Sequence, residues 1–120
     1  MRYMGSGRTG TFDWLFQRVT GVALAVILGV HFILLHYLGT GNVTYETAAP
    51  RLASPYYKGL QLLFLVLALY HAMNGIKLVI DDYVHNPGCR VVLTSLNWVA
   101  TIAFFLFGAI TILTFKYVAS

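Results

Sequence analysis

His71 stands well inside a long uncharged stretch of the sequence, and Gly75 follows it one helical turn later. At about 100° per residue, a helix would place four residues of this region on one narrow stripe, namely His71, Gly75, Leu78 and Asp82. An imidazole there could be an axial ligand of haem iron, with the glycine leaving room for the macrocycle. A histidine that hydrogen-bonds a neighbouring helix or handles protons is the alternative, and the residues alone leave both open.

Three consecutive polar residues, Asp81, Asp82 and Tyr83, end the same segment. Two carboxylates and a phenol could exchange protons with a membrane-soluble quinone and hydrogen-bond its carbonyl oxygen. An ordinary solvated helix end has the same composition. The motif therefore indicates a quinone site only in combination with other features.

The first apolar segment carries Arg18 near its start and His31 and His36 further along. Arg18 must extend to the membrane surface, pair with an acid or meet an anionic group such as a haem propionate. His31 is deep and His36 is nearer the far end, and each could be a ligand or a hydrogen-bonded histidine. Nearly on the face of Arg18 lie three small residues that would permit close helix packing, Gly21, Ala25 and Gly29.

The elements that carry these residues follow from composition. The chain has 120 residues, of which 58% are hydrophobic and 10% charged, whereas an ordinary domain has about 25% charged residues. Its charges leave three long uncharged runs, Val19–Tyr45, Gly59–Ile76 and Val91–Phe115. Since about 20 apolar residues in a helix cross a bilayer, the sequence predicts an all-α membrane protein with three transmembrane helices. What lies outside them is too short for a soluble catalytic domain, so any chemistry must involve cofactors or partner chains.

We expect the three spans at about 13–38, 55–84 and 91–117, within one transmembrane domain, 1–120. Gly39-Thr-Gly-Asn should stop the first span, and Ser54-Pro55 should begin the second, with serine as cap and proline in the first position. Asn86-Pro87-Gly88 should form the turn before the third. Residues 1–11 should be a loose cytoplasmic tail.

The charges predict an orientation. Five basic residues flank the spans on one side, against three on the other: Arg2, Arg8, Arg18, Lys77 and Arg90, against Arg51, Lys58 and Lys116. This distribution favours an N-terminus in the cytoplasm and a C-terminus outside. Scattered single basic residues do not indicate nucleic-acid binding. Because no transit peptide is recognisable, we expect the cytoplasmic (inner) membrane of a prokaryote.

Two further features limit the chemistry. Cys89 is the only cysteine, so an intrachain disulfide is excluded. The spans lack the residues of an iron–sulfur or zinc site. In the third span the polar and small residues indicate helix packing: Thr94, Asn97, Trp98, Thr101, Gly108 and Thr111.

Taken together, the segment Trp14-Leu-Phe-Gln-Arg18-Val-Thr20-Gly21 and the run from His71-Ala-Met-Asn74-Gly75 to Asp81-Asp82-Tyr83-Val resemble a known family. The family is that of the small haem b membrane anchors of succinate dehydrogenase (succinate:quinone oxidoreductase, respiratory complex II). The resemblance extends over about residues 12–117. The Asp-Tyr-Val ending favours the D type, although the Asn-Gly-Ile-basic run is shared with the C type.

The resemblance implies a role for each matching residue. His71 would be an axial ligand of haem b, with the opposite ligand on the second span of a C-type anchor that completes the helix bundle. Tyr83 would hydrogen-bond a quinone carbonyl, Asp82 would lie in the proton path, and Arg18 would lie near the haem propionates or the quinone. Electrons would come from a succinate-oxidising flavoprotein subunit through an iron–sulfur subunit. Members with two haems use a histidine deep in the first span, which His31 could supply.

The resemblance leaves several functions open. Fumarate reductases share this architecture, so the direction of the reaction and the choice of ubiquinone or menaquinone stay open. Dihaem anchors of formate dehydrogenases or hydrogenases usually have more spans and more histidines. A haem-free structural tether is another alternative, whereas a transporter subunit would need a charged or broken helix in mid-membrane.

Overall fold

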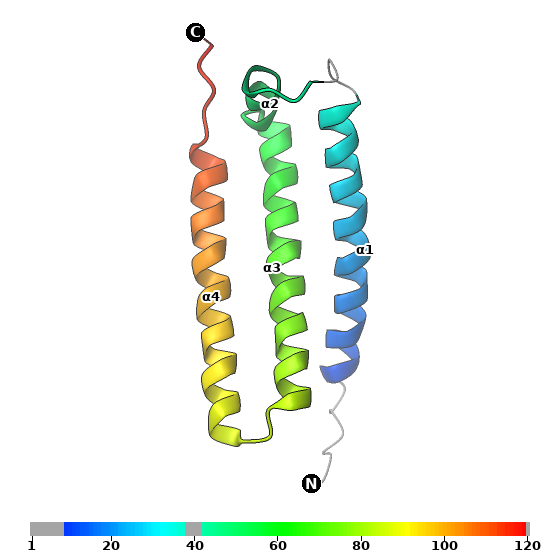
Figure 1. The fold of residues 1–120 in the computed structure, drawn as a ribbon, viewed down its shortest axis with the longest axis vertical. Coiled ribbons are helices and arrows are strands. Elements are labelled where there is room, and N and C mark those ends of the chain that lie inside the picture. The colour runs from blue at the N-terminus through cyan, green and yellow to red at the C-terminus, as the bar shows by residue number, and fades with distance from the viewer. Residues whose placement is uncertain (1–8, 38–41, 120) are drawn as a thin grey trace.

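The computed structural model describes residues 9–37 and 42–119, which form helices joined by short connections, with no strand in those ranges. In chain order the helices are α1 (Thr9–His36), α2 (Tyr45–Leu52), α3 (Pro55–Tyr83) and α4 (Pro87–Thr114) (Figure 1). The three long helices have 28 or 29 residues, or about 42 Å at 1.5 Å per residue. All three are long and apolar enough to cross a membrane. The prediction of an all-α protein with three spans is confirmed.

The helix ends differ from the predicted ones by a few residues. α1 begins at Thr9, so the last part of the predicted tail is helical, and residues 1–8 lie outside the described ranges. Most of the predicted stop at Gly39 also lies outside them. α4 begins at Pro87 instead of Val91, because Asn86 caps it: the Asn86 Oδ1 accepts the amides of residues 88 and 89 at 2.9 and 3.2 Å.

The far end of α4 is also shorter than predicted. The helix stops at Thr114, where Phe115 becomes extended. At this end Lys58 donates from its Nζ to the carbonyl oxygens of Leu113 and Phe115, at 3.3 and 2.7 Å. These bonds give the last carbonyls of the helix a partner without a further turn.

The segment between the first two spans contains a helix that the sequence did not predict. α2 has eight residues and is capped reciprocally by Thr44 and Thr47. It packs on α3, and its Ala49 is buried. α3 itself begins at Pro55 as predicted, but the side chain of Ser54 makes no capping hydrogen bond. The proline and the extended backbone of Ser54 therefore define this helix start.

α3 lies between α1 and α4 and packs on both (Figure 1). The three long helices alternate in direction, so the start of α1, the end of α3 and the start of α4 lie at one end of the molecule. His71 and Tyr83 both lie in the half of α3 that approaches this end. The fold thus brings the early part of α1 next to the late part of α3.

The interior of this layer is polar and its surface is apolar. In the described ranges the buried side chains include Thr20, Asn74 and Asn97, whereas Ala49 and Ile80 are the only buried apolar ones. Large apolar side chains are exposed along all three long helices. This distribution suits a bilayer, where lipid covers apolar side chains and hydrogen bonds join helices.

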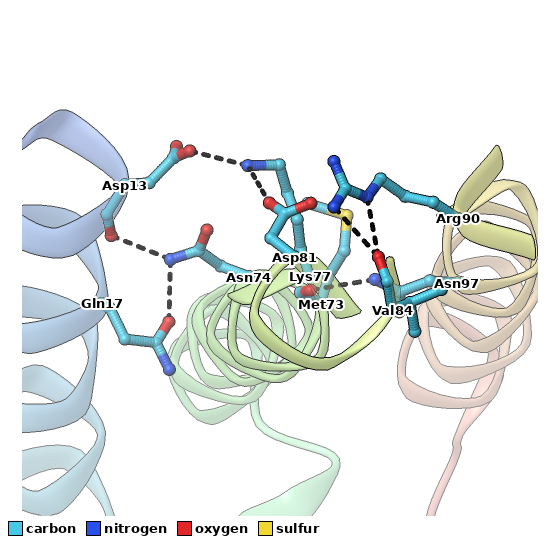
Figure 2. Close-up of polar contacts among 9 residues, drawn as sticks. All are labelled: Asp13, Gln17, Met73, Asn74, Lys77, Asp81, Val84, Arg90 and Asn97. Carbon is cyan, nitrogen blue, oxygen red and sulfur yellow. Dashed lines mark hydrogen bonds and ion pairs between the residues drawn. The ribbon is translucent and has the colours of Figure 1, made fainter. Parts of the chain in front are cut away.

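Basic side chains close the C-terminal ends of the long helices. Besides Lys58 at α4, the Arg51 guanidinium donates to the carbonyl of Leu34 in the last turn of α1. Arg90 donates to the carbonyl of Val84 at the end of α3, from Nη2 at 2.9 Å (Figure 2). The last carbonyls of a helix lack partners and carry partial negative charge, so each cation is favourable there. Several of the charges that predict orientation therefore also cap helices.

Candidate functional site

The imidazole of His71 lies in the contact between α3 and α1. Its Nδ1 is 3.1 Å from the Oγ1 of Thr20, and its Nε2 is 3.4 Å from the Nε2 of Gln17. Gly21 lies against the ring, since a Cβ built on it would be 3.2 Å from the His71 Cε1. The missing side chain at Gly21 thus lets α1 approach the histidine directly.

An open groove of about 390 Å³ borders His71 on the surface of α3. Apart from Gln17 of α1, its lining comes from the same stretch of α3: His71, Ala72, Gly75, Ile76, Val79 and Ile80. A Cβ on Gly75 would come within 3.1 Å of the Gln17 Nε2. His71 and Gly75 therefore line the same groove, and the amide of Gln17 lies against Gly75.

A network of polar side chains joins α1 to α3 near the end of the molecule where α1 begins (Figure 2). The distribution of basic residues predicts that this end faces the cytoplasm. The Asn74 Nδ2 donates to the backbone carbonyl of Asp13 at 2.8 Å and to the Oε1 of Gln17 at 3.0 Å. The Lys77 Nζ is 2.9 Å from an Asp13 carboxylate oxygen and 3.6 Å from one of Asp81. Sequence reasoning missed the Asp13–Lys77 pair. The spacing of Asn74, Lys77 and Asp81 puts these three residues on one face of α3, and this pattern could have indicated the network.

The three polar residues at the end of α3 separate into two groups. All three are exposed, Tyr83 to 77%. Asp81 nevertheless belongs to the network through Lys77. Within the described part of the chain, Asp82 forms no ion pair. The predicted pair of Asp82 and Tyr83 therefore stands at the surface, and a closed pocket around it would need walls from another chain.

Arg18 lies on α1 with its guanidinium 4.4 Å from the centre of the Trp14 ring, in a cation–π contact. Its neighbours Gln17 and Thr20 contact His71, so Arg18 is level with His71. Tyr83 lies about 18 Å further along α3, at 1.5 Å per residue. Arg18 is thus level with the histidine along the bundle, with its guanidinium on Trp14, and far along the helices from Tyr83.

The other two histidines of α1 lie in its second half. His31 has its Nδ1 2.6 Å from the Oη of Tyr57 and borders a second pocket of about 280 Å³ between α1, α3 and α4. His36 is exposed, stacks on Phe32 with ring centres 4.1 Å apart, and contacts the Phe32 carbonyl through Nδ1 at 3.0 Å. Each histidine has a hydrogen-bonding partner within this chain.

The packing prediction for the third span holds at two positions. The buried Asn97 donates from Nδ2 to the carbonyl of Met73 on α3 at 2.9 Å. Gly108 lies against Leu65, where a Cβ would come within 2.9 Å of a leucine methyl group. Thr101 and Thr111 instead donate to carbonyls of their own helix. On α1, Gly21 contacts α3, but Gly29 faces open space.

No three His, Cys, Asp or Glu side chains gather at one point in residues 9–37 or 42–119. A single imidazole is the donor that a protein supplies at an axial position of haem, whose porphyrin provides four nitrogen ligands. The imidazole of His71 borders the open groove beside Gly75.

Comparison with known proteins identifies similar chains. Residues 2–111 match the family described as "Succinate dehydrogenase/Fumarate reductase transmembrane subunit". The chain is 33% identical over 104 residues to the succinate dehydrogenase hydrophobic membrane anchor subunit of Rickettsia conorii, which covers 84% of this chain and 82% of the relative. It is 29% identical over 97 residues to the subunit of the same name from Archaeoglobus fulgidus, with 79% and 81% covered. For the Rickettsia bellii subunit the values are 32% over 111 residues, with 92% and 82% covered.

Proposed function

Since the chain belongs to the succinate dehydrogenase/fumarate reductase transmembrane subunit family, we propose that it anchors a succinate:quinone oxidoreductase in the membrane and binds haem b through His71. The family membership confirms the resemblance in the sequence. Under this proposal a C-type anchor supplies the second axial ligand, and an iron–sulfur subunit delivers electrons from a succinate-oxidising flavoprotein. The membrane would be the inner membrane of a prokaryote, with the N-terminus in the cytoplasm.

The observation that carries the haem assignment is the placement of His71. One ring nitrogen contacts Thr20, and the ring borders an open groove beside Gly75. When bound, haem b would supply one-electron redox chemistry. His71 would hold the iron, and Arg18, which is level with it, would pair with a propionate. His31, which is hydrogen-bonded to Tyr57, is assigned a structural role, with a second haem as the alternative that haem counting tests.

Tyr83 and Asp82 form this chain's part of the proposed quinone site. The phenol would donate a hydrogen bond to a quinone carbonyl oxygen, and the carboxylate beside it would pass protons from the aqueous side. Both residues are exposed at the end of α3, where the partner anchor and the iron–sulfur subunit would enclose the quinone. Arg18 is level with His71 and about 18 Å from Tyr83 along the helices, which favours the haem over the quinone as its partner.

The haem assignment is tested by reduced-minus-oxidised spectra of the purified complex. His71→Ala should abolish the b-type band. The control His36→Ala should keep it, because His36 is exposed and its ring stacks on Phe32 and hydrogen-bonds the Phe32 carbonyl of its own helix. A wild-type complex without haem would contradict the proposal and leave a haem-free tether. Haem per complex, measured again in His31→Ala, distinguishes one haem from two.

The quinone assignment is tested by Tyr83→Phe. Losing one hydrogen bond of about 1.4 kcal/mol should slow quinone reduction roughly tenfold, while succinate oxidation by an artificial acceptor stays intact. Tyr56→Phe is the control, because Tyr56 is also exposed, to 92%, but lies at the other end of α3. A parallel loss of both activities in Tyr83→Phe would indicate defective assembly and remove Tyr83 from the quinone site.

A further inference from the structure

We propose that Thr20 is a positioning residue for His71: its hydroxyl fixes the imidazole as the tautomer protonated on Nδ1, so that Nε2 carries the lone pair offered to iron. This inference rests on the proposed haem function and adds to it a residue on a different helix. It follows from two separate sets of hydrogen bonds, one at each ring nitrogen.

The first set surrounds the Thr20 hydroxyl, which is buried with 5% of the residue exposed. Its Oγ1 lies 2.6 Å from the carbonyl oxygen of Phe16 and 3.2 Å from that of Gln17. Carbonyl oxygens only accept, so the single hydroxyl proton is donated to the backbone of α1. The Oγ1 can then only accept from the Nδ1 of His71 at 3.1 Å, which requires a proton on Nδ1.

The second set begins at the backbone carbonyl of Asp13, which also can only accept. The amide group of Asn74 that faces it at 2.8 Å must therefore be the NH₂ group. This nitrogen also lies 3.0 Å from the side chain of Gln17, which fixes the Gln17 oxygen on that side. The Gln17 NH₂ is then left facing the Nε2 of His71 at 3.4 Å, and a donor there requires an unprotonated Nε2.

Both sets of hydrogen bonds require the His71 tautomer that is protonated on Nδ1, and no hydrogen bond belongs to both sets. The contact of Thr20 with Nδ1 is of ordinary length, whereas the contact of Gln17 with Nε2 is long for a hydrogen bond. Nε2 is accordingly the nitrogen that is more readily released to a ligand. Histidines that bind metals usually donate their other N–H to an oxygen, which orients the ring and raises its basicity. Thr20 would do this for His71 across the contact between α1 and α3.

The test is Thr20→Val in the assembled complex, which keeps the shape of the side chain and removes the acceptor. Loss of such a partner weakens metal binding by about 10- to 100-fold, so haem transfer to apomyoglobin should be faster by a similar factor. If ferric haem loses about tenfold more affinity than ferrous haem, the midpoint potential rises by about 59 mV. Thr20→Ser should restore both values. Thr101→Val is the matched control, because Thr101 donates only to its own helix.

If Thr20→Val kept the wild-type midpoint potential and the wild-type rate of haem transfer, the inference would be overturned. The proposed function would still stand if His71→Ala lost the b-type band. A band that persists in His71→Ala would instead reject the proposed function. Gln17→Leu should shift the potential less than Thr20→Val, and the reverse order would assign the iron to Nδ1. If the valine variant does not assemble, the same comparison between Thr20→Ala and Thr20→Ser decides.

Discussion

Two buried asparagines join α3 to its neighbours. Asn74 donates to a backbone carbonyl of α1, and Asn97 of α4 donates to the Met73 carbonyl of α3. Within a bilayer no water is available to bind these amides, so each has to be satisfied by another helix. Polar side chains therefore join the helices alongside apolar contacts such as that of Gly108 with Leu65.

Asn97→Leu should weaken the contact between α3 and α4. The lost hydrogen bond between helices is worth about 0.6–2 kcal/mol in a membrane, and the free energy of unfolding of the solubilised complex in SDS should fall by that amount. Thr111→Val is the control, since Thr111 is exposed and bonds to its own helix. Equal stability of the two variants would mean that Asn97 contributes nothing to this contact.

At the level of helices, two glycines of α1 that look equivalent in the sequence should behave differently. Gly21→Ala places a Cβ about 3.2 Å from the His71 Cε1, so the ring or the helix must shift, whereas a Cβ on Gly29 meets open space. We expect Gly21→Ala to lower haem content and to shift the spectrum of the bound haem. Gly29→Ala should leave both unchanged. Identical spectra for the two variants would contradict the close approach of α1 to His71.

The spans of the fold could be predicted from the sequence, whereas the exact helix ends and α2 could not. Uncharged runs are sufficient to predict three spans, because a bilayer excludes charge over a fixed length. Helix ends depend on individual bonds, such as those of Asn86 and Lys58, and so were displaced by a few residues. α2 has only eight residues, too few for a periodic pattern to stand out from a polar linker.

The sequence predicted which site residues share a face of one helix, but it did not predict the contacts between helices. Periodicity placed His71 and Gly75 on one stripe, and the structure puts both on one groove. The contacts of Thr20 and Gln17 with His71 depend on how far α1 is shifted along α3, and no local pattern contains that information. Tyr83 was predicted as a quinone ligand, and the structure leaves it 77% exposed at the end of α3, so this chain alone does not test that prediction.

On the scale of the whole molecule, the chain forms a layer of three spanning helices with α3 in the middle (Figure 1). Its surface carries large apolar side chains, among them Phe107 and Val22, which are 76% and 66% exposed. His71, Asp82 and Tyr83 all lie in one half of this layer. One chain therefore provides one wall of the proposed site, and the position of that half relative to the cytoplasm decides where electrons can enter.

The lone cysteine allows this orientation to be measured. Cys89 is exposed in the first turn of α4, at the end of the molecule where α1 begins. The distribution of basic residues predicts that this end lies in the cytoplasm. A membrane-impermeant maleimide should then label Cys89 in inside-out vesicles and leave it unlabelled in intact cells. Labelling after detergent treatment gives the total reactivity and corrects for any shielding by partner subunits.

A second cysteine position provides the opposite control. Thr44 is exposed just before α2, at the other end of the layer. A Thr44→Cys substitution in a Cys89→Ser background should therefore be labelled in intact cells, provided that the reagent crosses any outer membrane. If Cys89 were labelled from outside and Thr44→Cys from inside, the chain would be inverted. Tyr83 and Asp82 would then face away from an iron–sulfur subunit in the cytoplasm, so the proposed path of electrons to the quinone could not hold.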